Sequence, residues 1–286
     1  MFSVLICSIN KTFLENIKLN IKETIGCEHE IIVWDNNIDQ KPISEVYNHL
    51  ASKAKYPYWC FVHEDVGFQT QNWSECLLKA FTANLSLGLI GIAGAKYKSR
   101  TPSGWSTGIL KYDYCNIYHL NKAGQKQRLF NNPTDSQIEE VVNIDGVFMV
   151  IRREVWHDAI FNAQLLRGFH LYDIDFSIQV SKKWTSAVIF NIDIVHYTQG
   201  GDFGDAWIKY TLIWHKEFRN DLPLSALTDK PPVNIEGKIT NNWLYRLSTE
   251  KISLRNKWKW IRASKAMYRP SSWPYIGLFL VRRIFR

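Results

Sequence analysis

Apolar side chains along the first hundred residues fall into two kinds of segment. Four short runs are almost continuously apolar, which is typical of strands buried on both faces of a sheet. The segments between them place apolar side chains on one helix face, so they predict helices. Strands that alternate with helices predict an α/β fold, with a mostly parallel sheet flanked by helices. The expected strands are residues 3–9, 30–34, 58–62 and 87–94, and the expected helices are residues 11–25, 42–54 and 73–84.

The pattern is less regular after residue 95, where polar residues predict loops and a few short strands up to residue 140. Residues 221–250 contain three prolines and predict a looser segment. The chain therefore divides into an α/β domain at residues 1–204 and a mainly helical C-terminal extension at residues 205–286. Within these parts we expect a strand and short helix at 141–156, a helix at 172–184, a strand at 187–197 and a helix at 205–220.

Positive charge is concentrated at the C-terminal end. The net charge is +8, yet residues 251–286 hold ten Lys or Arg and no Asp or Glu, so the first 250 residues are close to neutral. Cations mixed with aromatic side chains are typical of segments at an anionic membrane surface, and we expect such a contact here. Alternatively, the aromatic side chains pack on the main domain. Pro270 and Pro274 predict two short segments rather than one helix. The aromatic residues are Trp258, Trp260, Trp273, Tyr275, Phe279 and Phe285.

Composition excludes several other classes of protein. The five cysteines are scattered and never spaced as CxxC, so neither a disulfide framework nor a zinc site is expected. The N-terminus has no basic region before its short apolar run, and no window reaches the roughly 18 apolar residues of a membrane span. We expect a cytoplasmic protein, peripheral on the inner face of the cytoplasmic membrane. Nucleic-acid binding is not expected, because the main domain is close to neutral.

Polar side chains directly follow two of the predicted strands. The third strand runs into His63, Glu64 and Asp65, and the second runs into Asp35 and Asn36. Ligands of parallel sheets bind at the carboxyl ends of strands, so both groups are expected at one cleft. Alternate side chains of an extended segment share a face, which places His63 with Asp65. Carboxylates suit Mg²⁺ or Mn²⁺ that bridges to phosphate. An ordinary solvated turn is the alternative for either group.

Two further positions carry candidate chemistry. Asp173 and Asp175 begin a predicted helix, where a carboxylate can act as a general base or simply cap the helix. Asp175 is expected to raise the pKa of Asp173. His196 ends a predicted strand just before Gly200 and Gly201, and it is either a ligand or a structural histidine.

Together these segments resemble the family 2 glycosyltransferases, which have the GT-A fold. "SVLICSIN" and "EIIVWDNN" are similar to the first two strands of that family, "YDIDFSIQV" to its EDxDLxxR segment, and "VIFNIDIVHY" to the strand that ends in its late histidine. Asn48, Ala54, Phe61 and His63 keep the family's spacing up to the start of its DxD motif. More narrowly, "FVHEDV" resembles a bacterial subgroup in which this motif reads HQDV. The resemblance covers roughly residues 3–200.

This resemblance implies an inverting glycosyltransferase that uses a nucleotide-sugar donor, Mn²⁺ or Mg²⁺, and a hydroxyl of a glycan or lipid-linked acceptor. Polysaccharide or lipopolysaccharide biosynthesis is the implied setting. The resemblance implies Asp173 as the catalytic base and Asp65 and His196 as metal contacts. It implies that the donor is bound by Asp35, Asn36, Asn48, His63, Glu64 and Asp145.

The sequence departs from the family pattern at three places. His63 replaces the first DxD aspartate, Tyr172 stands where the family often has Glu, and Val180 or Ser181 replaces a terminal Arg. A nucleotidyltransferase is one alternative, but it usually has an early glycine-rich phosphate loop, and "ICSINKTFLEN" has no glycine. A non-catalytic nucleotide-sugar-binding module is the other. The presence of Asp65, Asp173 and His196 together argues against it.

Overall fold

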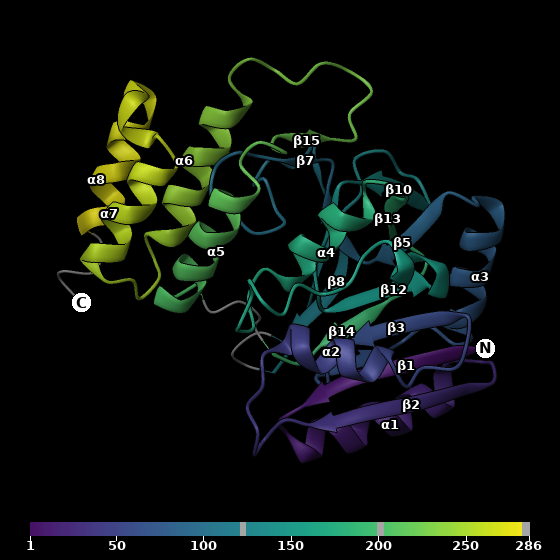
Figure 1. Ribbon diagram of the computed structural model, residues 1–286. Coiled ribbons are helices and arrows are strands. Elements are labelled where there is room, and N and C mark those ends of the chain that lie inside the picture. Colours follow the sequence, from purple (N-terminus) through teal and green to yellow (C-terminus); the bar gives the residue numbers. More distant parts are fainter. Residues whose placement is uncertain (121–123, 199–202, 282–286) are drawn as a thin grey trace.

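The computed structural model describes residues 1–120, 124–198 and 203–281, and its centre is a seven-stranded sheet (Figure 1). The strand order is β10-β13-β5-β12-β3-β1-β2. β1 pairs in parallel with β2 and β3, and β13 with β5, while β12 and β10 run antiparallel to their neighbours. Five of the seven strands therefore point the same way, as expected for a mostly parallel sheet. The strands are β1 (Phe2–Ser8), β2 (His29–Asp35), β3 (Tyr58–Val62), β5 (Leu87–Gly91), β10 (Ile138–Val141), β12 (Phe148–Arg152) and β13 (Thr185–Ile189).

Helices cover both faces of this sheet because its strands are apolar on both sides. Val4 of β1 belongs to the core cluster that α1 and α3 complete, whereas Leu5 belongs to the cluster that α2 and α4 complete. Consecutive side chains of a strand point to opposite faces, so the two helix pairs lie on opposite faces of the sheet. The elements are α1 (Lys11–Thr24), α2 (Ile43–Ala51), α3 (Trp73–Ala83), α4 (Tyr172–Val180) and the 3₁₀ helix η1 (Arg153–His157).

The single strand expected at residues 187–197 is wrong, because the chain breaks there and changes sheets. β13 belongs to the central sheet, and the next strand, β14, belongs to a second sheet. In the break, the side-chain amide of Asn116 donates to the carbonyls of Phe190 and Ile192. The break places His196 opposite Val66, next to Asp65. The second sheet contains β4 (Val66–Phe68), β6 (Ala93–Ala95), β8 (Asp113–Leu120), β9 (Lys126–Asn131), β11 (Asn143–Ile144) and β14 (Ile194–His196).

The chain after residue 204 is mainly helical, as expected, but the looser segment predicted for 221–250 is wrong in its second half. A helix forms there because the three prolines all precede it and its apolar residues keep helical spacing. Two helices, separated by 3₁₀ turns, follow in the basic tail. The elements are α5 (Asp205–Glu217), α6 (Ile235–Leu247), α7 (Leu254–Ala263), η2 (Ala266–Tyr268), η3 (Pro270–Ser272) and α8 (Trp273–Val281), with β15 (Leu224–Ser225) pairing β7 (Tyr97–Lys98).

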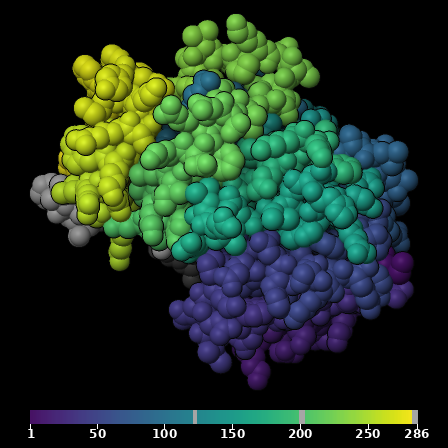
Figure 2. Space-filling model, viewed as in Figure 1, coloured from purple at the N-terminus to yellow at the C-terminus, as the bar shows by residue number. Residues whose placement is uncertain are grey.

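These C-terminal helices share a hydrophobic core with the α/β domain. Tyr97 and Ile174, from the N-terminal part of the chain, cluster with Trp207, Trp243 and Trp260 of the extension. The indole N–H of Trp260 donates to the carbonyl of Pro102 over 3.0 Å. In Figure 2 the C-terminal helices form one end of the molecule and the N-terminal strands lie at the other. No helix among the described residues is long and apolar enough to cross a membrane.

Candidate active site

A cleft of about 830 Å³ opens at the carboxyl ends of β1, β2 and β3. Residues that follow these three strands line the cleft, among them Asn10, Asn37 and Asp65. The loop before α4 and the end of β14 also line it, with Phe169 and His196. The cleft therefore lies where polar side chains follow the strands, as the sequence predicts.

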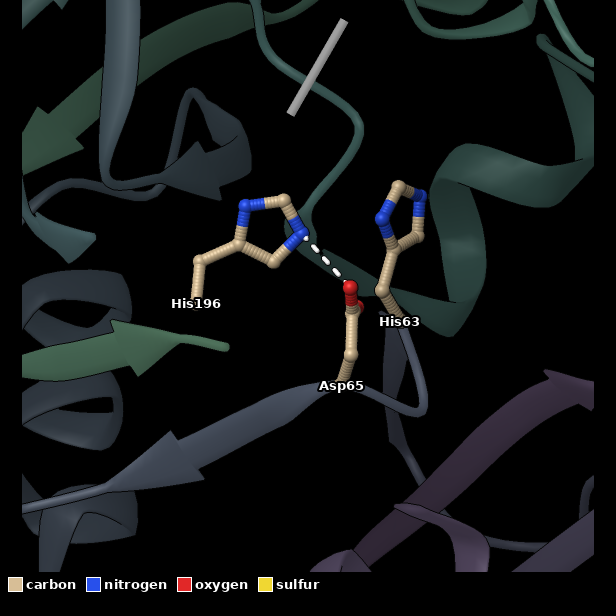
Figure 3. A group of neighbouring side chains, drawn as sticks. All are labelled: His63, Asp65 and His196. Atoms are coloured by element: carbon tan, nitrogen blue, oxygen red, sulfur yellow. Dashed lines mark ion pairs between the residues drawn. The ribbon is translucent and has the colours of Figure 1, made fainter. Parts of the chain in front are cut away.

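His63, Asp65 and His196 converge in this cleft, and each offers a ligand atom within 4.8 Å of the others (Figure 3). Nε2 of His196 lies 3.1 Å from Oδ2 of Asp65, and the Thr198 hydroxyl donates to the same oxygen over 2.7 Å. Burial alone would raise the pKa of the Asp65 carboxyl, but the hydrogen bond and charge of His196 hold it below its usual range. Asp65 is therefore ionised at neutral pH.

The donor set fits a divalent transition-metal ion. Two imidazoles and one carboxylate suit divalent first-row transition-metal ions, whereas Mg²⁺ is usually bound through oxygen ligands. An imidazole must be neutral to bind a metal. Burial and the neighbouring His196 lower the pKa of His63 to about 4, so this ring is neutral at neutral pH.

The His63 ring contacts the hydroxyl of Tyr172, the first residue of α4. Nε2 of His63 lies 2.7 Å from the Tyr172 hydroxyl oxygen, and this hydroxyl also donates to the carbonyl of Gly146 over 3.1 Å. Tyr172 is only 3% exposed. The two residues at which the sequence departs most clearly from the family pattern are therefore in direct contact.

Glu64 points away from His63 and Asp65, toward the end of β1. Its carboxylate accepts hydrogen bonds from the Ser8 hydroxyl and from the backbone N–H groups of Ile9 and Asn10. These contacts fix the turn between β3 and β4 against the start of α1. Glu64 also lines the cleft, and its donor-binding role stays a prediction.

Asp173 contacts the backbone of Gly146 and lies near enough to Asp145 to be affected by its charge. The backbone N–H of Gly146 donates to Oδ2 of Asp173 over 3.0 Å. Burial and the charge of Asp145 raise the pKa of Asp173 to about 7. Asp175, which we expected to raise the pKa of Asp173, is not among the causes of this shift. Its carboxylate instead accepts hydrogen bonds from the Trp214 indole over 2.9 Å and from the Gln179 amide over 2.6 Å. Asp175 therefore serves the packing of α4 against α5.

Three other residues that were predicted to bind the nucleotide-sugar donor differ in their exposure and in their contacts. Asn36 lines the cleft, but both ends of its amide bond the backbone of Lys41. The amide of Asn48 bonds the backbone of Phe161 at both ends, which ties α2 to the segment before α4. Asp35 is exposed, and its carboxylate accepts from the N–H of Asn37 over 3.1 Å. Their roles toward a donor stay predictions.

Several residues at this site were not predicted from the sequence. Phe169 is 56% exposed and its ring centre lies 5.4 Å from that of His63, so it forms an apolar wall over the cluster. Arg167 brings a positive charge to the same wall. Both precede α4 in a loop without a recognisable spacing. Gly200 and Gly201 lie outside the described residues.

The chain belongs to a glycosyltransferase-like family, whose model matches residues 3–218. No curated protein sequence matches it. Among solved structures, GalNAc-T7 with UDP, GalNAc and Mn²⁺ is similar with a TM-score of 0.52 and 10% identity, over 93% of this chain and 55% of that one. This chain thus spans about half the length of GalNAc-T7. The likeness shows the fold, which is of the GT-A type.

Two further solved structures match with lower TM-scores. TarS residues 1–349 from S. aureus has a TM-score of 0.49 and 14% identity, over 94% of this chain and 81% of that one. The mannosyltransferase PcManGT from Pyrobaculum calidifontis, in complex with GDP-Man and Mn²⁺, has a TM-score of 0.44 and 12% identity, over 99% of this chain and 87% of that one.

Proposed function

We propose that this protein transfers a sugar from a nucleotide-diphosphate donor to a hydroxyl of a glycan or lipid-linked acceptor, with inversion at the anomeric carbon. The observation that carries the proposal is the His63, Asp65 and His196 cluster in a cleft at the carboxyl end of the sheet. Membership of a glycosyltransferase-like family supports it. The short stretch "FVHEDV" supports placement in the bacterial subgroup with an HQDV motif.

Asp173 is the proposed base. As the acceptor oxygen forms its bond to the anomeric carbon, its proton passes to the Asp173 carboxylate, and the bond from carbon to diphosphate oxygen breaks on the opposite face. General base catalysis of this kind typically contributes ~10²–10⁴-fold. A pKa near 7 lets the carboxylate accept a proton and still be largely ionised at slightly alkaline pH.

His63, Asp65 and His196 are proposed to hold Mn²⁺ in preference to Mg²⁺, because two of the three ligands are imidazoles. When bound, the ion would supply positive charge that stabilises the departing diphosphate. Arg167, which lines the same cleft, would add to this positive field. GalNAc-T7 was solved with UDP and Mn²⁺, which supports a nucleotide and this ion as partners.

The proposed setting is the inner surface of the cytoplasmic membrane, in polysaccharide or lipopolysaccharide assembly. Part of the aromatic tail packs inward, since Trp260 and Phe279 are fully buried. Trp258 and Trp273, in contrast, are 43% and 60% exposed. Arg255, Lys259 and Arg262 surround a surface hollow together with Trp258. A face of α7 that mixes cations with an exposed indole fits anionic lipid headgroups.

The products of the reaction test this function against its alternatives. The purified protein would be incubated with a panel of nucleotide-sugars and glycan or lipid-linked acceptors, with Mn²⁺ or with EDTA. Release of nucleoside diphosphate together with a glycosylated acceptor supports the proposal. Pyrophosphate formed from a nucleoside triphosphate and a sugar phosphate would identify a nucleotidyltransferase. Donor binding without turnover would identify a binding module.

A further inference from the structure

The hydroxyl of Tyr172 lies between His63, a candidate metal ligand, and the carbonyl of Gly146, the residue whose backbone N–H bonds the predicted base Asp173. It lies 2.7 Å from Nε2 of His63 and 3.1 Å from the carbonyl oxygen of Gly146. We propose that Tyr172 is a positioning residue that selects the metal-binding tautomer of His63 and links it, through Gly146, to Asp173. This inference rests on the proposed metal-dependent function.

Proton counting sets the direction of the two hydrogen bonds. A tyrosine hydroxyl has one hydrogen, and its oxygen can also accept. If that hydrogen goes to the carbonyl of Gly146, the contact with His63 requires a proton on Nε2 of the imidazole. A neutral imidazole carries one N–H, so Nδ1 then keeps its lone pair. Figure 3 shows the other ring nitrogen of His63 facing Asp65 and His196.

The opposite arrangement gives up one of the two hydrogen bonds of the Tyr172 hydroxyl. If Tyr172 donated to Nε2 of His63, the carbonyl of Gly146 would lose its bond from this hydroxyl. The imidazole proton would then sit on Nδ1 and point into the cluster, where it blocks a metal ligand. A buried polar group without a partner is unfavourable, so the first arrangement is preferred. The bonds that fix the tautomer are thus the bonds that leave Nδ1 free to bind an ion.

The same contact reaches Asp173 through Gly146. Tyr172 and Asp173 are consecutive residues, and both bond the backbone of Gly146. The Tyr172 hydroxyl donates to the carbonyl of Gly146, and the Asp173 carboxylate accepts from its N–H. A Cβ added at Gly146 would lie 2.2 Å from the Tyr172 hydroxyl oxygen. Because this fit is close, the position of His63 depends on Gly146, whose N–H also bonds Asp173.

A pair of single-atom variants tests the role of Tyr172. Tyr172→Phe removes the hydroxyl that bonds His63. Tyr47→Phe is the matched control, because Tyr47 is equally buried, its ring centre lies 5.9 Å from that of Tyr172, and its hydroxyl has no hydrogen-bond partner among the described residues. Mn²⁺ affinity would be measured from the electron paramagnetic resonance signal of the free ion. Thermal unfolding would show that both variants fold.

Tyr172→Phe should weaken Mn²⁺ binding by roughly 10–100-fold, as loss of an outer-shell partner typically does, while Tyr47→Phe leaves it unchanged. In metal-free protein, ¹⁵N NMR should place the His63 proton on Nε2, and Tyr172→Phe should populate the Nδ1–H form. The signal would be assigned with a His63→Gln variant. Equal Mn²⁺ affinities of the two variants, or a wild-type His63 protonated on Nδ1, would overturn the inference. Failure of wild-type protein to bind Mn²⁺ would overturn the proposed metal dependence as well.

Discussion

The carboxylate of Asp145 lies close enough to Asp173 for its charge to add to burial in raising the pKa of Asp173 to about 7. A base must be ionised before it can accept a proton, so the transfer rate should rise with pH through about 7. This rise follows from the direction of the shift: a carboxyl with its ordinary pKa would be fully ionised well below neutral pH.

Replacing Asp145 should shift the pH at which the transfer rate rises. Asp145→Asn removes the charge that opposes ionisation of Asp173, so the midpoint of the rate against pH should fall below that of the wild type. Asp175→Asn is the matched control, because Asp175 also lies in the first turn of α4 yet is bound to Trp214 and Gln179. The measurement is the initial rate at saturating donor from pH 5 to 9. A midpoint that moves with Asp175→Asn and not with Asp145→Asn would contradict this assignment.

Asp173→Asn should separate binding from chemistry. The amide keeps the shape of the side chain but cannot accept the acceptor's proton, so the rate should fall by ~10²–10⁴-fold. Donor affinity, measured by calorimetry, should stay close to that of the wild type. Near-normal turnover in this variant would show that another group is the base.

Asp65→Ala should abolish the contribution of metal to donor binding. In wild-type protein we expect donor affinity to rise when Mn²⁺ replaces EDTA, and in the variant we expect no rise, because the one carboxylate of the cluster is gone. His119→Gln is the control: its ring centre lies 5.2 Å from that of His196, but His119 is not part of the cluster. The idea fails if wild-type affinity is the same in EDTA and in Mn²⁺.

Removing two cations from the exposed face of α7 should weaken binding to anionic membranes. Each cation near such a surface contributes about 1 kcal/mol, so Arg255→Gln with Arg262→Gln should lower partitioning roughly 25-fold. Lys22→Gln with Lys79→Gln removes the same charge from exposed positions on α1 and α3. Figure 1 shows these helices on the far side of the molecule from α7.

The measurement is co-sedimentation with phosphatidylcholine vesicles, with and without phosphatidylglycerol, at low and high salt. Wild-type protein should bind only the anionic vesicles, and less at high salt. If the two double variants sedimented equally, or if no protein, wild type included, bound the vesicles, the proposed contact with the membrane would be wrong.

Gly146→Ala should disturb both stability and metal binding. The added Cβ would lie 2.2 Å from the Tyr172 hydroxyl oxygen and 3.0 Å from the Cβ of Asp173, so neighbouring groups must move. Overpacking of this kind typically costs about 1–3 kcal/mol, and denaturant unfolding would measure it. At Gly277 in α8 nothing lies within 4 Å of an added Cβ, so Gly277→Ala should be neutral or slightly stabilising. Comparable losses in both variants would argue against a close fit at Gly146.

The parts of the fold that local sequence determines were predictable. β1, β3 and β5 are buried on both faces, so their side chains are almost all apolar and the runs are easily recognised. β2 lies half-buried at the edge of the sheet, but its centre, residues 31–34, is still an apolar run. The break between β13 and β14 was not predictable, because Asn116 makes it from a strand distant in sequence. α6 was missed because the prolines before it outweighed the helical spacing of Ile235, Ile239 and Trp243.

At the site, too, the features set by local sequence were predictable and those set by residues distant in sequence were not. His63 and Asp65 follow a strand directly, so their place at a cleft could be inferred, and the structure brings His196 to them. The influence of Asp175 on Asp173 was predicted wrongly, because residues two apart on a helix point in different directions. Asp145 acts instead, and it belongs to the segment between β11 and β12. No local pattern indicates that Tyr172 reaches His63.

The indole of Trp260 bonds the carbonyl of Pro102, and its ring is fully buried in a core that also contains Tyr97 and Ile174. A shortened chain that stops near residue 250 would therefore uncover apolar surface on the α/β domain, next to the helix that begins with Tyr172. With such a deletion, a loss of membrane binding could not be distinguished from the effect of partial unfolding. The extension is not a detachable module, and point substitutions on its outer face are the sound way to ask what it binds.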